Sequence, residues 1–118
     1  MSEEVVIYNH PNPEIKSFLP PKNICPPVVE HFKKPVEKDF QAMAKRLGLI
    51  GAQAVKEIMA IPGVKELRIK PKEVIVKKES WVSWDGIEAQ ILRILARAVR
   101  KKHISVVKSQ IAPGPPQG

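Results

Sequence analysis

The distribution of proline divides this sequence into a part that cannot be helical and a part that can. Seven of its twelve prolines fall between residues 11 and 35. Proline lacks a backbone N–H and has a fixed φ, so this stretch cannot be helix and can hold only short, edge-type strands. Two further prolines, Pro62 and Pro71, each end a periodic segment. Helices are therefore expected from Pro35 to Ile61 and after the second of these breaks.

Two short strands are expected before the first helix. Residues 5–8 are β-branched and aromatic, and the turn-forming residues 9–13 end that segment. Residues 15–19 return as a second strand until the prolines that follow stop it. From Asn23 to Lys34 the sequence predicts an irregular loop.

The next stretch has helical periodicity with a break in the middle. Pro35 suits the first turn of a helix, and Glu37 and Asp39 lie near its positive end. Apolar residues then recur at helical spacing on both sides of Gly48 and Gly51. The pattern predicts two short helices, or one long helix kinked at the glycines.

A hairpin follows. Residues 64–70 alternate, with Leu67 and Ile69 on one face and basic residues on the other. Pro71-Lys72 turns the chain, and residues 74–76 form the returning strand.

The last element is a strong amphipathic helix. Ser83 or Asp85 can cap it. Its apolar residues form one stripe, Ile87, Ile91, Ile94, Leu95 and Ala98. Its basic residues lie on another side, Arg93, Arg97, Arg100 and Lys101. Residues 104–107 extend the helix or lie back on the core.

These elements predict an α+β two-layer sandwich in the order ββαββα. An antiparallel sheet with helices on one face buries the apolar stripes most economically. We expect a single domain over residues 1–108 and a disordered Pro/Gly-rich tail over residues 109–118, which has little to bury.

Composition excludes several functional classes. The chain has 118 residues, a formal net charge of +8 and a single cysteine, Cys25. One thiol allows no intramolecular disulfide and no cysteine-only metal site within one chain. No phosphate loop, catalytic triad or paired-carboxylate pattern is present, so we expect no enzyme. The sequence has no membrane span, and a cytoplasmic protein is expected.

Three blocks resemble the N-terminal domain of the Nfu/NifU iron–sulfur scaffold family. The first is Pro-Asn-Pro at 11–13 with Lys16 and Phe18, and the second is the helix that ends in Ile61-Pro62-Gly63-Val64. The third is the strand 74–78 with the Trp-Asp pair that opens the last helix. The resemblance spans roughly residues 5–99.

The resemblance implies a role in iron–sulfur cluster assembly or delivery. The resemblance also implies that the cluster is held by a separate module carrying a Cys-x-x-Cys pair. This sequence lacks such a pair. The chain is then an accessory domain that holds no cluster and acts through an iron–sulfur scaffold or client protein. A small basic nucleic-acid-binding domain is the alternative, and a protein that only stabilises an oligomer is a third possibility. The sequence leaves the oligomeric state open.

The candidate site residues follow from these hypotheses. Partner binding is expected at Pro11, Asn12 and Pro13, which could equally be a rigid connector, and at the basic residues Arg93, Arg97, Arg100 and Lys101. Cys25 is either a packed thiol or a metal ligand that is shared across a dimer with His31 or His10. The three histidines, His10, His31 and His103, do not have the mutual spacing of metal ligands. Nucleic-acid binding would use Trp81 and Trp84 for stacking and Lys77, Lys78 and Arg93 for phosphates, whereas the structural alternative has Trp84 fasten the last helix to the sheet and Trp81 close the preceding loop.

Overall fold

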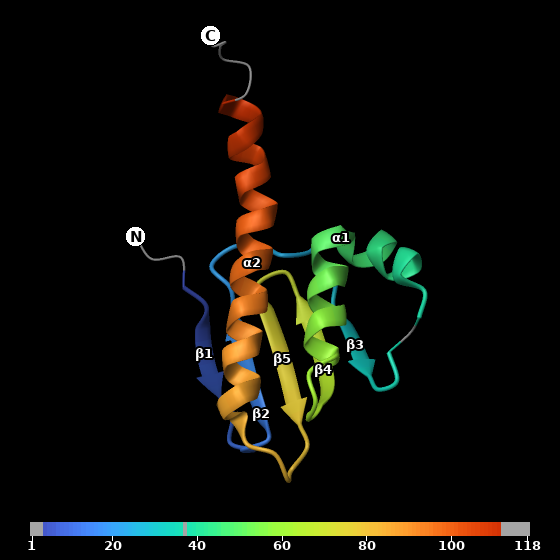
Figure 1. Cartoon of the computed structure of the whole chain (residues 1–118), viewed down its shortest axis with the longest axis vertical. Coiled ribbons are helices and arrows are strands. Elements are labelled where there is room, and N and C mark those ends of the chain that lie inside the picture. The colour runs from blue at the N-terminus through green and yellow to red at the C-terminus, as the bar shows by residue number, and fades with distance from the viewer. Residues whose placement is uncertain (1–3, 37, 112–118) are drawn as a thin grey trace.

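Five antiparallel strands form one sheet, and two helices cover one of its faces (Figure 1). The computed structural model of the chain describes residues 4–36 and 38–111, with side chains as far as Lys101. The elements are β1 (Val6–Asn9), β2 (Ile15–Leu19), β3 (Glu30–Lys33), α1 (Phe40–Met59), β4 (Val64–Lys70), β5 (Glu73–Lys78) and α2 (Trp84–Ile111). The predicted α+β fold with helices on one face is confirmed.

The strand order β1-β2-β5-β4-β3 places the two predicted hairpins side by side. Phe18 on β2 lies opposite Val74 on β5, which lies opposite Ile69 on β4. Residues directly opposite one another point to the same face of a sheet, and all three of these side chains are buried beneath the helices. The row next to it, Ser17, Ile75 and Arg68, must therefore point away from the helices.

The fifth strand, β3, lies where the sequence predicted a loop, so that prediction was wrong for residues 30–33. The strand is short and pairs only with β4, as an edge strand does. Phe32 is its one buried side chain and shares the inward face with Glu30, whereas His31 and Lys33 point outward and are exposed. Charged residues on a short edge strand oppose pairing with other chains, and one apolar residue among four gives little signal in the sequence.

The first helix begins later than predicted. It starts at Phe40 rather than Pro35, because the Asp39 side chain caps it by accepting a 3.0 Å hydrogen bond from the backbone N–H of Ala42. Glu37, which was predicted to lie near the positive end of this helix, is outside the described residues.

The predicted kink is confirmed at Gly48. Its φ of 79° lies in the left-handed region, which glycine adopts without steric cost. Figure 1 shows the resulting bend, with a short first segment of α1 set at an angle to the longer second segment. The second segment lies along the sheet beside α2, and Ala54, Val55 and Ile58 are buried there.

The second helix contributes the predicted apolar stripe to the core. Ser83 precedes its first turn and accepts a 3.1 Å hydrogen bond from the backbone N–H of Asp85. Ile91 and Leu95 are fully buried, and burying side chains of this size stabilises a fold by roughly 1.5–3 kcal/mol each. The helix includes residues 104–107 and continues beyond the sheet to Ile111. Residues 109–111 of the expected tail therefore belong to its last turn, and residues 112–118 lie outside the described part. Neither described helix contains a stretch long and apolar enough to span a bilayer.

Candidate protein-interaction surface

A groove runs along the seam between α1 and α2, and we call it the seam groove. One hollow of about 250 Å³ in this groove is lined by Leu49, Ile50, Gln53, Ala54, Glu57, Ile94, Arg97, Ala98 and Lys101. A second, of about 330 Å³, is lined by Glu57, Ala60, Ile61, Gln90, Arg93, Ile94 and Arg97. The two hollows share lining residues and therefore adjoin. The floor is mostly aliphatic, and the α2 edge is basic.

The helical spacing of α2 explains this basic edge. Arg93, Arg97 and Lys101 follow one another at intervals of four residues, so they lie on one side of the helix. That side borders the apolar stripe and faces the seam. The sequence predicted these basic residues as a docking surface, and the structure brings all three to one groove.

A carboxylate on α1 holds the central arginine of this edge. Arg97 Nη2 donates to Glu57 Oε1 at 2.9 Å, and Gln53 Nε2 donates to Glu57 Oε2 at 2.6 Å. The side chains of Arg97 and Glu57 are 48% and 31% exposed, and a surface pair of this kind contributes only about 0–1 kcal/mol to stability. The pair therefore orients the guanidinium at little gain in stability.

Leu49 adds an exposed apolar residue to the groove. Its side chain is 68% exposed, directly after the kink at Gly48. The sequence did not identify Leu49 or Glu57 as site residues. The helix pattern alone could not reveal them, because their role depends on the packing of α1 against α2.

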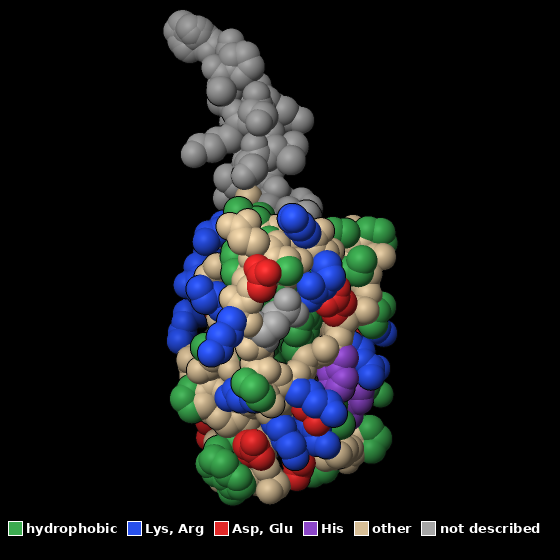
Figure 2. Space-filling view, turned by 90° about the vertical axis from the view of Figure 1, so that its right-hand side faces the viewer, with side chains coloured by type: hydrophobic (Ala, Val, Ile, Leu, Met, Phe, Trp, Pro, Cys, Tyr) green, Lys and Arg blue, Asp and Glu red, His purple; other side chains and the backbone are tan. Residues whose placement is uncertain are grey.

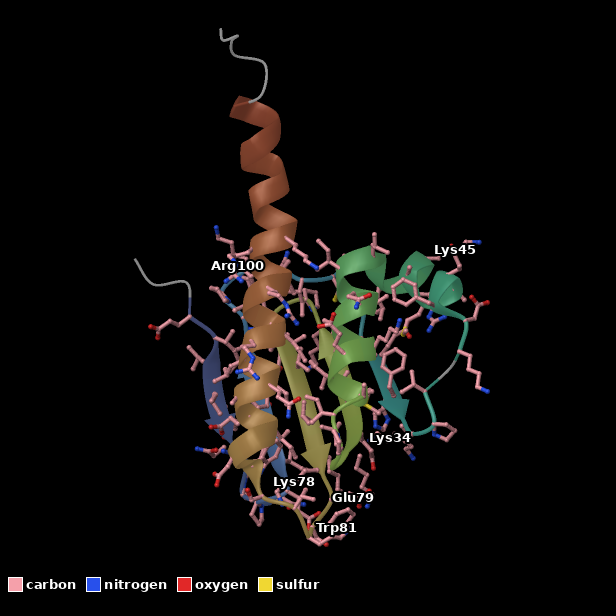
Figure 3. The ribbon with its side chains drawn as sticks, in the orientation of Figure 1. Lys34, Lys45, Lys78, Glu79, Trp81 and Arg100 are labelled. Atoms are coloured by element: carbon pink, nitrogen blue, oxygen red, sulfur yellow. The ribbon has the colours of Figure 1, made fainter. Side chains whose placement is uncertain are left out.

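The other predicted docking residues lie apart from the groove. Arg100 is exposed on α2 (Figure 3) and does not line either hollow. Pro11, Asn12 and Pro13 form the β1–β2 turn, where the Trp84 indole N–H donates to the Pro13 carbonyl at 2.8 Å. Trp84 opens α2, and Arg97 is thirteen residues further along the chain. At 1.5 Å per residue, the turn and the centre of the basic edge are about 20 Å apart along the helix.

Hydrogen bonds hold the β1–β2 turn in one shape. The Asn12 side-chain carbonyl accepts from the backbone N–H of Glu14 at 2.9 Å, and its backbone carbonyl accepts from Ile15 at 3.0 Å. These contacts favour the interpretation of this segment as a rigid connector. Recognition of a partner by Pro11, Asn12 and Pro13 stays a prediction.

Cys25 lies in the protein core. It is only 3% exposed and packs against Gly51 of α1 so closely that a Cβ added to this glycine would lie 3.0 Å from the Cys25 Cβ. His31 points to the opposite side of the sheet, and His10 lies beside Ser17 on that same side. The structure therefore does not bring Cys25 together with either histidine. The His103 side chain lies outside the described residues.

The residues suggested for nucleic-acid binding are dispersed. Lys77 and Lys78 are neighbours on β5 and so point to opposite faces, and Lys78 is buried, with its ammonium donating to the Glu79 carbonyl at 3.1 Å. Trp84 is half-buried against Phe18, with ring centroids 6.2 Å apart, which confirms its structural role in joining α2 to the sheet. Trp81 is 77% exposed at the lower end of the molecule (Figure 3), so it does not close the loop by burial. These residues do not form one surface.

The fold is shared with solved structures of low sequence identity. The chain is similar to the NifU-like protein from Saccharomyces cerevisiae, with 18% identity, a TM-score of 0.61, and coverage of 85% of this chain and 82% of the other. It is also similar to protein SAV1430 from Staphylococcus aureus, with 13% identity, a TM-score of 0.58, and coverage of 77% and 96%. No curated protein sequence matches the chain.

The sequence itself assigns the family. The family model for the scaffold protein Nfu/NifU N terminal matches residues 5–102, which is most of the chain. The chain therefore belongs to the Nfu/NifU N-terminal family, and the resemblance noted in its sequence is confirmed. This family is linked to iron–sulfur cluster assembly.

Proposed function

We propose that this protein is an accessory protein-interaction domain in iron–sulfur cluster assembly or delivery, and that it holds no cluster itself. The observation that carries the proposal is the family match over residues 5–102. The cluster is then the cargo of a scaffold or client protein to which this domain binds. We expect no catalytic activity and a site of action in the cytoplasm.

The donor chemistry of the chain supports a role without a bound cluster. Iron–sulfur clusters need several thiolate ligands, and the single cysteine is in the core against Gly51. Within the described part of the chain, His, Cys, Asp and Glu side chains do not gather in threes in a way that could hold a metal ion. The residues present therefore do not fit a cluster within one chain.

The seam groove supports docking as the mechanism. Its aliphatic floor and the basic edge of Arg93, Arg97 and Lys101 suit an amphipathic segment with acidic residues along one side. Arginine binds carboxylates through its planar fork of donors, and Arg97 is already oriented by Glu57. On docking, a carboxylate of the partner would share or replace the Glu57 contact.

A binding measurement with the cluster-bearing module of the family tests this proposal. A separately expressed Cys-x-x-Cys module, loaded with cluster under anaerobic conditions, is titrated with this protein and the heat of binding is recorded. We expect saturable binding that Arg93→Ala and Arg97→Ala each weaken by about tenfold, the loss of one good charged contact.

The matched control is Lys45→Gln. Lys45 is exposed on the first segment of α1 (Figure 3) and does not line the groove, so removing its charge should leave binding unchanged. Equal weakening by Lys45→Gln would show a general effect of charge and would contradict docking at the seam groove. No binding by the wild-type protein would contradict docking to this class of partner.

A further inference from the structure

The helices leave one face of the sheet uncovered, and we call it the open face. One row of side chains across it is polar or aromatic except for Ile75 at its centre. Register places Tyr8, Ser17, Ile75, Arg68 and His31 directly opposite one another across all five strands. With neighbouring strands about 4.8 Å apart, this row is about 19 Å long. The next row contains Ile15, Lys77, Glu66 and Lys33.

A shallow hollow of about 260 Å³ lies at the centre of the open face. Its floor includes Ile15 and Ile75, and its walls include the two imidazoles of His10 and His31 and the cationic groups of Arg68 and Lys77. Figure 2, seen from the β3 side, shows histidine side chains beside Lys and Arg at the margin of the molecule. Two cationic groups, two imidazoles and the Glu66 carboxylate therefore surround an aliphatic floor.

The balance of charge on the open face is positive. Its basic side chains are Lys33, Arg68, Lys70 and Lys77, and its two carboxylates are Glu66 and Glu73. Both carboxylates are engaged. Glu73 lies 3.6 Å from Lys70, and Glu66 accepts from His31 Nε2 at 2.9 Å. Desolvation alone would raise the pKa of Glu66, but the hydrogen bond and charge of His31, with the charges of Lys33 and Lys77, lower that pKa overall.

Planar side chains lie at both ends of the row. Tyr8 is 57% exposed and meets the His10 ring edge-on, with centroids 5.1 Å apart and planes at 81°. His10 Nε2 is in turn 2.7 Å from Ser17 Oγ, which fixes the imidazole over β2. At the other end His31 is held by Glu66. Aromatic and guanidinium planes on an open sheet are the surfaces on which unpaired bases stack.

We propose that the open face binds single-stranded nucleic acid, with Tyr8 stacking on a base and Lys33, Arg68 and Lys77 contacting phosphates. This activity goes beyond the proposed function and uses a surface on the other side of the sheet from the seam groove. Charge complementarity selects the ligand, since Lys33, Arg68 and Lys77 lie at and beside the hollow on the three neighbouring strands β3, β4 and β5, over about 10 Å. The aliphatic side chains at the centre of the open face, Ile15 and Ile75, are half-buried, and the exposed Val6 lies apart from them on the edge strand β1. Among the described residues, the centre of this face therefore presents no large apolar patch that would favour a membrane or an apolar protein surface.

Fluorescence anisotropy with a labelled oligouridylate tests the proposal on the full chain. An oligonucleotide of about twelve residues falls within the roughly 4–16 nucleotides that a single-strand-binding domain covers. We expect a Kd of about 10⁻⁴–10⁻⁶ M at moderate salt, with the logarithm of the binding constant falling against the logarithm of the salt concentration at a slope of about −2 for three phosphate contacts. Lys33→Gln, Arg68→Gln and Lys77→Gln should each reduce that slope by about 0.7.

Tyr8 separates base stacking from simple attraction of charge. Tyr8→Ala should weaken binding by about tenfold or more without changing the salt slope, and Tyr8→Phe should restore it, because either ring can stack. Lys45→Gln is the matched charge control and should leave the slope unchanged. Circular dichroism confirms that each surface variant is folded.

Three results would overturn the proposal. They are no anisotropy change with the wild-type protein, an equal loss of slope in Lys45→Gln, or binding to polyacrylate as tight as to the oligonucleotide and insensitive to Tyr8→Ala. The last result would identify a polyanion surface without base recognition. None of these outcomes bears on docking to an iron–sulfur partner, so the two proposals can fail separately.

Discussion

Two helical glycines with different surroundings, Gly51 in α1 and Gly86 in α2, offer a sharp test of how tightly the Cys25 segment packs. A Cβ on Gly51 would lie 3.0 Å from Cys25 Cβ, 3.2 Å from the Ile24 carbonyl oxygen and 3.3 Å from Leu47 Cβ. A Cβ on Gly86 would meet nothing within 4 Å. The backbone of Ile24 is itself fixed, since its N–H donates to the Pro71 carbonyl at 2.9 Å.

The two Gly→Ala variants should therefore change stability in different directions. Alanine gains about 1 kcal/mol over glycine in a helix interior, and somewhat less near an end. Overpacking a well-filled core costs about 1–3 kcal/mol. Because the propensity gain is common to both sites, Gly51→Ala should lower the free energy of unfolding by about 1–3 kcal/mol relative to Gly86→Ala, whereas Gly86→Ala should equal or exceed the wild type.

Urea denaturation followed by circular dichroism measures both free energies, and the m-value checks that the unfolding transition is unchanged. Cys25→Gly removes the Cys25 Cβ, the atom nearest to the added methyl group. In a Cys25→Gly background, Gly51→Ala should therefore lower the free energy of unfolding less than it does in the wild type. Cys25→Ala keeps this Cβ, so in that background the effect of Gly51→Ala should stay as large as in the wild type. If Gly51→Ala is as stable as Gly86→Ala, the segment does not pack on α1 as described, and the argument for a buried thiol fails.

Three further substitutions or reactions probe other parts of the structure. Trp84→Phe removes the 2.8 Å hydrogen bond to Pro13 and should cost about 0.5–1.5 kcal/mol in urea denaturation, and no change would argue against a fixed β1–β2 turn. The pKa of Glu66 is lowered in the folded protein, so the stability that its carboxylate contributes is complete above the ordinary value of 4.5 and is lost as the pH falls through the folded value. Glu66→Gln should remove this part of the acid-induced loss, measured as the free energy of unfolding between pH 6 and pH 3. An unaltered pH profile would contradict the His31–Glu66 contact. The Cys25 thiol should react with a disulfide reagent much more slowly in the native protein than in urea, and equal rates would contradict its burial.

Periodicity predicted most of the fold because the strands and helices bury regular stripes. The alternation around Leu67 and Ile69 and the stripe through Ile91 and Leu95 each identified the correct face. The glycine kink was predictable because two glycines interrupt the helical pattern, and glycine adopts the positive φ found at Gly48 without steric cost. Where a single apolar residue carries an element, as Phe32 does for β3, the pattern is too short to be seen. The helix start at Asp39 was missed because Pro35 offered an equally reasonable start.

The candidate site was only partly predictable, because it depends on contacts between distant segments. The basic residues of α2 were visible as a stripe, but their apolar neighbour Leu49 and the carboxylate that orients Arg97 come from α1. Only part of the open face was predicted, the basic side of the strand 64–70, since the face combines residues of five strands whose order the sequence did not specify. By contrast, the structural role of Trp84 followed from its position at the start of an amphipathic helix.

Anaerobic reconstitution tests the central claim, that this domain serves a cluster held by another protein. The purified chain is incubated with ferrous iron, sulfide and a thiol reductant, desalted, and examined by visible absorption and by iron analysis. We expect a colourless protein without stoichiometric iron, and the same result for Cys25→Ala. A stable brown protein whose colour is lost in Cys25→Ala would contradict this claim and would show a cluster shared between chains.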